Sequence, residues 1–170
     1  MNGPRAVLVG PMGVGKSTVG KLLATRWGVT YRDTDDDIVA AEGRSIPEIF
    51  TADGEAAFRT VEIRAVRSAL AGHRGVLALG GGAILDAGTR ALLAAHPVVY
   101  LAMGAEEAAR RAGLDRSRPL LAADPGRRWR ELMEARRHLY EEVASAAVHT
   151  DGRSPEEITQ EVSSALELRI

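Results

Sequence analysis

Short apolar runs alternate along the chain with longer stretches in which apolar residues recur every third or fourth position. Apolar runs of this length are typical of buried strands, and five occur, at residues 6–9, 29–32, 75–79, 98–101 and 146–149. The periodic stretches predict helices at about 18–27, 38–41, 55–70, 87–95, 105–111 and 127–143, and a last helix up to Leu168. Strands that alternate with helices predict an α/β fold with a doubly wound parallel sheet.

Caps and glycines set several helix boundaries. Ser45-Ile46-Pro47-Glu48 is a capping box that predicts a short helix through Phe50. Ser154-Pro155-Glu156-Glu157 is a second capping box, which begins the last helix. Gly43 and Gly72 are expected to end the helices before them. No repeat or linker interrupts the pattern, so we expect one domain over residues 1–170.

A phosphate-binding motif follows the first predicted strand. Residues 10–18 fit G-x-x-x-x-G-K-[ST], and we expect Gly13, Val14, Gly15, Lys16, Ser17 and Thr18 to bind a nucleotide. Glycines let backbone N–H groups wrap a polyphosphate, and the helix that follows adds its positive dipole end. Lys16 would reach the terminal phosphates and Ser17 would hold Mg²⁺. A strand before and a helix after favour this interpretation over a chance glycine-rich turn.

Unusual residues gather where the predicted strands end. The second strand leads into the acidic run 33–37, the third into Gly80-Gly81-Gly82, and the fifth into residues 150–153. Ligands of doubly wound sheets bind outside the carboxyl ends of the strands. These segments and the phosphate loop therefore predict one composite active site.

The acidic run contains two candidate functional carboxylates. Asp33 and Asp35 lie two apart on a chain that leaves a strand, so both can face one side. A phosphate-loop enzyme needs a carboxylate behind the waters of Mg²⁺ and a group that binds or deprotonates the nucleophile. We expect these two to be functional and Asp36 or Asp37 to cap the next helix. The alternative is that the whole run only caps that helix.

Glycines and arginines supply the other candidates. Gly80, Gly81 and Gly82 indicate close approach of the backbone to a ligand, or only a flexible turn. Arg59, Arg118 and Arg136 could clamp a carboxylate or the transferred phosphoryl group. Twenty of the 22 basic residues are arginine, so a solvated surface position is the commoner role for any one of them. Arg59 could also pair only with Glu62 on the same helix.

Composition narrows the functional classes. The chain has 170 residues, 45% of them hydrophobic, a net charge of −1 and no cysteine. This charge argues against general nucleic-acid binding, and disulfides and thiolate metal sites are excluded. No apolar run approaches membrane-spanning length and residues 1–5 lack a signal-peptide pattern, so we expect a cytoplasmic protein without membrane contacts. The four histidines lack ligand-like spacing.

An ordered set of motifs resembles the shikimate kinase family, within the nucleoside-monophosphate-kinase group of P-loop proteins. The set spans nearly the whole chain and comprises Gly10–Thr18, Asp33-Thr34-Asp35, Gly43-Arg44-Ser45-Ile46, Gly54-Glu55, Phe58-Arg59 with Glu62, Gly80-Gly81-Gly82, Arg118-Pro119-Leu120-Leu121, and Arg136 with Leu139-Tyr140. The resemblance implies ATP- and Mg²⁺-dependent phosphorylation of the shikimate 3-hydroxyl, in aromatic amino-acid biosynthesis. It also implies sheet order 2-3-1-4-5, a monomer, acceptor-binding helices at about 35–62 and a mobile lid at about 112–126.

The resemblance also implies roles for individual residues. Asp35 would bind the ring hydroxyls and could take the proton, while Asp33 would lie behind the Mg²⁺ waters. Arg59 and Arg136, with the glycine backbone, would hold the substrate carboxylate. Apolar pocket walls would come from Ile46, Phe50 and Phe58. Arg118 would meet the phosphates from the lid, and the adenine would be flanked by Arg111, Arg153 and Pro155.

Three other functions compete with this one. A P-loop kinase for another hydroxylated acid, such as gluconate, would share the phosphate loop but not the later motifs together. A GTP-dependent switch needs an Asn-Lys-x-Asp motif, and the only asparagine is Asn2. A regulatory domain that binds a nucleotide without catalysis predicts ATP binding without turnover.

Overall fold

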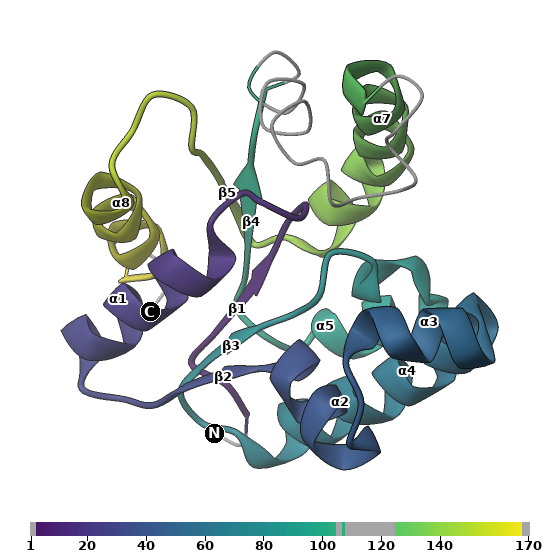
Figure 1. Ribbon diagram of the computed structural model, residues 1–170. Coiled ribbons are helices and arrows are strands. Elements are labelled where there is room, and N and C mark those ends of the chain that lie inside the picture. The colour runs from purple at the N-terminus through teal and green to yellow at the C-terminus, as the bar shows by residue number, and fades with distance from the viewer. Residues whose placement is uncertain (1–2, 105–106, 108–124, 168–170) are drawn as a thin grey trace.

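Five parallel strands form the centre of the molecule in the order β2-β3-β1-β4-β5. The computed structural model describes residues 3–104, 107 and 125–167. The strands are β1 (Ala6–Val9), β2 (Tyr31–Asp33), β3 (Val76–Ala78), β4 (Val98–Ala102) and β5 (Ala146–His149). Val7 of β1 lies beside Leu77 on one side and Val98 on the other. The sheet is twisted, and β2 and β5 are its edges (Figure 1).

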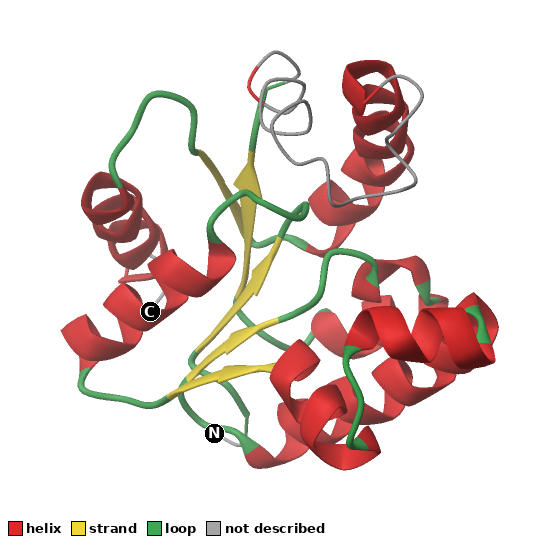
Figure 2. Ribbon diagram, viewed as in Figure 1, coloured by secondary structure: helices red, strands yellow, loops and turns green. Residues whose placement is uncertain are grey.

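Helices cover both faces of the sheet (Figure 2). On one face, α1 (Lys16–Trp27) and α8 (Pro155–Glu167) pack side by side and bury Leu23 and Val162 against Leu8 of β1. On the other face, α4 (Glu55–Gly72), α5 (Ala87–Leu93) and α7 (Pro125–Val143) bury an apolar cluster that includes Val9 and Leu77. The fold is therefore the predicted three-layer α/β arrangement, with the predicted strand order.

A smaller helical group lies beside the β2 edge of the sheet. It consists of α2 (Thr34–Glu42), α3 (Ile46–Asp53) and the first half of α4, and its core is Ile38, Ile49 and Phe58. These helices occupy the segment expected to bind the acceptor, and Figure 1 shows them next to one another. Ser45 caps α3 by accepting a hydrogen bond from the Glu48 amide at 3.2 Å, as its capping box predicts.

Some boundaries differ from expectation. A 3-10 turn, η1 (Ala83–Leu85), was not predicted, and β2 begins at Tyr31 rather than Val29. Residues 125 and 126, expected to end the lid, are instead the first residues of α7. The helix expected at 105–111 and the rest of the lid lie outside the described residues. Within the described parts of the chain, no helix is long and apolar enough to cross a membrane.

Candidate active site

The phosphate loop leaves β1 at its carboxyl end and leads directly into α1. Gly10 approaches β4 so closely that a Cβ atom there would lie 2.6 Å from the Leu101 carbonyl oxygen. Gly13 and Gly15 have φ angles of 82° and 102°, which L-residues with side chains rarely adopt. Gly15 immediately precedes α1, so the first amides of that helix face the loop. This geometry suits an anion.

Lys16 lies inside the loop that it is expected to serve. Its Nζ atom donates hydrogen bonds to the carbonyl oxygens of Gly10 at 2.6 Å and Pro11 at 3.0 Å. Val14 is buried beneath the loop, whereas Ser17 and Thr18 are exposed at its mouth. The predicted nucleotide residues from Gly13 to Thr18 therefore surround one concave backbone turn.

Asp33 occupies the junction between β2 and α2. Its Oδ1 atom accepts a hydrogen bond from the Asp35 amide at 2.8 Å, which makes Asp33 the N-cap of α2. The prediction that Asp36 or Asp37 caps this helix is wrong, because the strand continues to Asp33 and the helix begins at the next residue. Burial raises the pKa of the Asp33 carboxyl, although the hydrogen bond from the Asp35 amide opposes this shift.

Asp35 lies in the first turn of α2. Burial first, and then the neighbouring negative charges of Asp33 and Glu62, raise the pKa of Asp35 to about 6. A Cβ atom on Gly80 would lie 2.7 Å from the Asp35 Oδ1 atom. The carboxylate is thus packed against the glycine segment, where a base poised near neutral pH could meet a substrate hydroxyl.

The three glycines after β3 contact three different parts of the site. A Cβ atom on Gly81 would lie 3.4 Å from the backbone nitrogen of Met12 in the phosphate loop, and one on Gly82 would lie 2.5 Å from Arg59 Nη1. All three glycines are among the described residues, and none of them has a positive φ angle. Close approach to other parts of the protein, rather than an unusual backbone conformation, therefore explains this glycine segment.

Arg59 forms the local ion pair that the sequence left open. Its Nη1 atom lies 2.7 Å from Glu62 Oε1, and the Glu62 side chain is 4% exposed. Arg59 Nε and Arg136 Nε are buried, and neither has a hydrogen-bond partner among the described residues. A buried N–H without a partner is rare in folded proteins. Two such groups, on α4 and α7, are therefore well suited to receive an anionic ligand.

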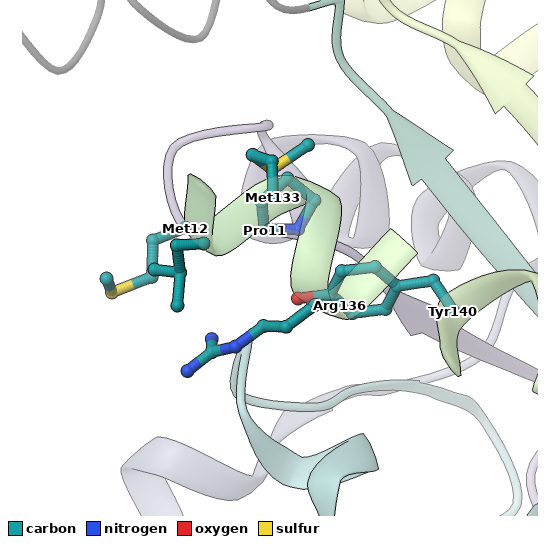
Figure 3. A pocket seen from close by; sticks show the side chains of 6 residues that line it. Pro11, Met12, Met133, Arg136 and Tyr140 are labelled. Carbon is teal, nitrogen blue, oxygen red and sulfur yellow. The ribbon is translucent and has the colours of Figure 1, made fainter. Parts of the chain in front are cut away.

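A small cavity separates the phosphate loop from α7. It is lined by Pro11, Met12, Leu132, Met133, Arg136 and Tyr140. Figure 3 shows Arg136 and Tyr140 projecting from α7 beside Pro11 and Met12. The Tyr140 hydroxyl is buried and donates a hydrogen bond to the Gly81 carbonyl oxygen at 2.6 Å, and burial raises its pKa to about 12. This bond ties α7 to the glycine segment.

Glu62 and Tyr140 are site residues to which sequence reasoning gave no role. Both belong to motifs of the family resemblance, and their spacing contained a signal. Glu62 is three positions after Arg59, and Tyr140 is four positions after Arg136, so each shares a helix face with a candidate arginine. Burial raises the pKa of the Glu62 carboxyl, while Arg59 and Arg136 lower it.

The expected apolar walls lie together in the helical group. Phe50 and Phe58 have ring centroids 4.7 Å apart, and Ile46 packs against the same cluster. The Arg59 guanidinium lies 5.3 Å from the centroid of the Phe58 ring. The walls therefore adjoin the arginine that is expected to hold the acceptor.

Of the expected adenine contacts, Arg153 and Pro155 lie among the described residues, whereas Arg111 lies outside them, as does Arg118, which is expected to meet the phosphates. Arg153 follows β5, donates a hydrogen bond to the His149 carbonyl oxygen at 3.0 Å and pairs with Glu161. Pro155 is the first residue of α8. These two residues lie at the carboxyl end of the sheet, on its β5 side.

The donor set fits a magnesium ion that is shared with phosphates and water. Among the described residues, no cluster of three or more His, Cys, Asp or Glu side chains could hold a metal by itself. Asp33 accepts a hydrogen bond from the Tyr31 hydroxyl and Ser17 lies close to the same hydroxyl, so a hydroxyl and a carboxylate oxygen lie near each other beside the phosphate loop. Mg²⁺ commonly takes one or two protein oxygen ligands and completes its shell with water and phosphate oxygens.

Comparisons with known proteins agree with this site. Residues 12–167 match the family model described as shikimate kinase. A shikimate kinase of Streptomyces coelicolor is 69% identical over 169 residues, which cover 99% of both chains. The solved shikimate kinase of Acinetobacter baumannii, in complex with shikimate, is 36% identical with a TM-score of 0.87, covering 99% of this chain and 95% of that one.

A gluconokinase from Sinorhizobium meliloti has a TM-score of 0.56 at 19% identity, covering 98% of this chain and 93% of that one, which indicates a shared fold alone. The family match spans the phosphate loop from Met12 onward, the glycine segment and both candidate arginines. The chain belongs to the shikimate kinase family.

Proposed function

We propose that this protein transfers the γ-phosphoryl group of ATP to the 3-hydroxyl of shikimate, giving shikimate 3-phosphate and ADP in the shikimate pathway. The observation that carries the proposal is the pair of buried Nε atoms of Arg59 and Arg136, neither of which has a hydrogen-bond partner within the described part of the chain. Arg59 lies against Gly82 of the glycine segment, which also contacts Asp35. Shikimate carries one carboxylate for this pair and ring hydroxyls for Asp35.

The nucleotide would bind in the phosphate loop. Backbone amides from Gly13 to Thr18 would surround the phosphates, and Lys16 would exchange its present carbonyl partners for phosphate oxygens. Arg118 would place a positive charge beside the transferred phosphoryl group. The adenine would be flanked by Arg111, Arg153 and Pro155.

Ser17 would bind Mg²⁺ directly and Asp33 would bind it through water. The ion would neutralise developing charge on the phosphate oxygens. Asp33 is fixed for this role, because both of its carboxylate oxygens already accept hydrogen bonds.

The acceptor would lie between the helical group and α7. Arg59 and Arg136 would grip its carboxylate, with Gly80, Gly81 and Gly82 leaving room for the ring. Ile46, Phe50 and Phe58 would limit the space on the apolar side. Because Glu62 holds Arg59 at 2.7 Å, the guanidinium is oriented before the acceptor arrives.

The chemical step needs one proton acceptor. The 3-hydroxyl oxygen would attack the γ-phosphorus, the bond to the β–γ bridging oxygen would break, and the hydroxyl proton would pass to Asp35. A carboxyl with a pKa of about 6 is ionised at neutral pH and retains more basicity than an ordinary aspartate.

A coupled assay of ADP release tests the proposal. Shikimate should support turnover, while gluconate, quinate and nucleoside monophosphates should support little. Lys16→Met should abolish turnover with the fold intact, and Lys21→Met, which removes the only other lysine, should not. Preference for gluconate would favour the other kinase class, and ATP binding without turnover on any acid would favour the regulatory domain.

We also propose that the protein acts in the cytoplasm, where ATP is supplied, and as a monomer, as the resemblance to shikimate kinases implies. Light scattering coupled to size-exclusion chromatography should give the mass of one 18.1 kDa chain. A stable dimer mass would contradict the monomer.

A further inference from the structure

Tyr31 lies between the phosphate loop and the acidic run. Its ring packs on α1 so closely that a Cβ atom on Gly20 would lie 2.4 Å from Tyr31 Cε2. The Lys21 ammonium lies 5.9 Å from the ring centroid. These contacts fix the position of the ring, and a phenylalanine could make all of them.

The Tyr31 hydroxyl makes further contacts, which a phenylalanine could not make. It donates a hydrogen bond to Asp33 Oδ2 at 3.2 Å, and the Ser17 side chain lies close to it. The Asp35 amide holds the other Asp33 oxygen at 2.8 Å. The Tyr31 hydroxyl therefore fixes the Asp33 carboxylate at the end of β2, beside the Ser17 side chain of α1, and the proposed function assigns both of these side chains to Mg²⁺.

We propose that Tyr31 is a positioning residue, whose hydroxyl fixes the Asp33 carboxylate beside Ser17 for the magnesium ion of the bound nucleotide. This inference rests on the nucleotide half of the proposed function. Groups that orient metal ligands commonly affect metal affinity although they do not touch the metal. A tyrosine that only fills space above Gly20 would leave metal affinity unchanged when its hydroxyl is removed.

Tyr31→Phe separates these roles, since it removes the hydroxyl and keeps the ring. We expect ADP binding in excess Mg²⁺, measured by isothermal titration calorimetry, to weaken roughly three- to tenfold, because one hydrogen bond is lost. ADP binding in EDTA should be unchanged. Tyr100→Phe, which removes a hydroxyl from β4, should alter neither measurement. Equal weakening with and without Mg²⁺, or no weakening at all, would overturn the proposal.

A double-mutant cycle tests the route through Asp33. Asp33→Asn keeps a residue that can cap α2 but removes the charge behind the Mg²⁺ waters. In that background, adding Tyr31→Phe should cause little further loss of Mg²⁺-dependent ADP binding. Fully additive losses would show that the hydroxyl does not act through Asp33. These titrations contain no acceptor, so they stand or fall separately from the choice of shikimate as substrate.

Discussion

Arg136 is a cleaner probe of the carboxylate clamp than Arg59. Removing Arg59 would strand Glu62, which is 4% exposed and paired to it, so loss of stability would be mixed with loss of binding. Arg136 has a buried Nε atom without a partner among the described residues, and its neighbour Arg137 has a side chain that is 58% exposed. The two adjacent arginines form a matched pair.

Arg136→Ala should lower kcat/KM for shikimate by roughly 30-fold to several thousand-fold, because truncating one side of a desolvated charge pair typically costs about 2–5 kcal/mol. Arg136→Lys should recover only part of this loss, since an ammonium cannot make a planar bidentate contact. ATP affinity should hardly change in either variant. Arg137→Ala should leave both parameters near the wild-type values, and equal losses in the two alanine variants would contradict the clamp.

Burial of the Asp35 carboxylate lowers the stability of the folded protein at neutral pH. The folded-state pKa of Asp35, about 6, lies above the ordinary value of 3.8, so the folded protein binds this proton more tightly than the unfolded chain does. The contribution of this proton to the free energy of unfolding is fully present below pH 3.8 and is lost as pH rises through 6. Asp35→Asn should therefore stabilise the ligand-free protein at pH 8 by about 1–3 kcal/mol, and the gain should shrink toward pH 4.

Urea unfolding at both pH values measures this effect. Glu156→Gln is the matched control, because Glu156 is an exposed carboxylate in the first turn of another helix, α8. Loss of that charge should slightly destabilise the helix through its dipole. A variant at Asp35 that is equally stabilised at pH 4 and pH 8, or destabilised at pH 8, would show that burial does not dominate its pKa.

At the scale of an element, the glycine segment sets the position of Arg59, because the absence of side chains leaves room for the guanidinium. Gly82→Ala would place a Cβ atom 2.5 Å from Arg59 Nη1, at the movable end of a side chain, so the fold should survive while the guanidinium shifts. We expect at least a tenfold fall in kcat/KM for shikimate, on the order of one charge-assisted hydrogen bond, with unchanged ATP affinity.

Gly72→Ala is the control for this change, because a Cβ atom at Gly72, the last residue of α4, would meet open space. That variant should keep its activity and be as stable as the wild type or slightly more so. Normal shikimate kinetics in Gly82→Ala would show that Arg59 tolerates displacement and does not hold the acceptor.

Helices and strands were predictable where burial leaves an apolar pattern in the sequence, and less so where backbone pairing alone sets the end of a strand. The four other strands were predicted close to their observed bounds from apolar runs, but β2 extends to Asp33, one residue beyond its predicted end. This polar residue is held in the strand by pairing with Ala78 of β3, which the apolar pattern does not reveal. The same extension made Asp33, rather than Asp36 or Asp37, the cap of α2.

Site residues followed a similar division. Lys16 and the glycines of the phosphate loop are predictable because their motif has a local mechanism. The pair between Arg59 and Glu62 was open to prediction from their spacing. The approach of Glu62 to Gly80 and the bond from Tyr140 to Gly81 join distant segments, and a single sequence does not record such distances. These contacts needed the packed structure.

The fold brings three separate segments together at the carboxyl end of the sheet. They are the loop after β1, the helical group around α2 and α4, and α7. Pro11 and Met12 meet α7 across a small cavity, and Gly81 approaches Met12 from β3 (Figure 3). The Tyr140 hydroxyl joins α7 to Gly81, residues 59 positions apart in the chain. This bond links the segment that supplies Arg136 to the segment that faces Arg59.

Tyr140→Phe tests whether that link serves the site as well as the fold. Losing a buried donor leaves the Gly81 carbonyl unsatisfied, which costs about 1–3 kcal/mol, and each kcal/mol lowers Tm by roughly 2–4 °C in a domain of this size. Because α7 would then hold Arg136 less firmly, kcat/KM for shikimate should fall several-fold while ATP affinity is retained. Tyr100→Phe removes a hydroxyl from the ring that stacks on Tyr140 at 5.0 Å and should change neither kinetics nor ATP binding. A lower Tm with normal shikimate kinetics would assign the Tyr140 bond to stability alone, and an unchanged Tm would show that the two segments are held together by their apolar contacts.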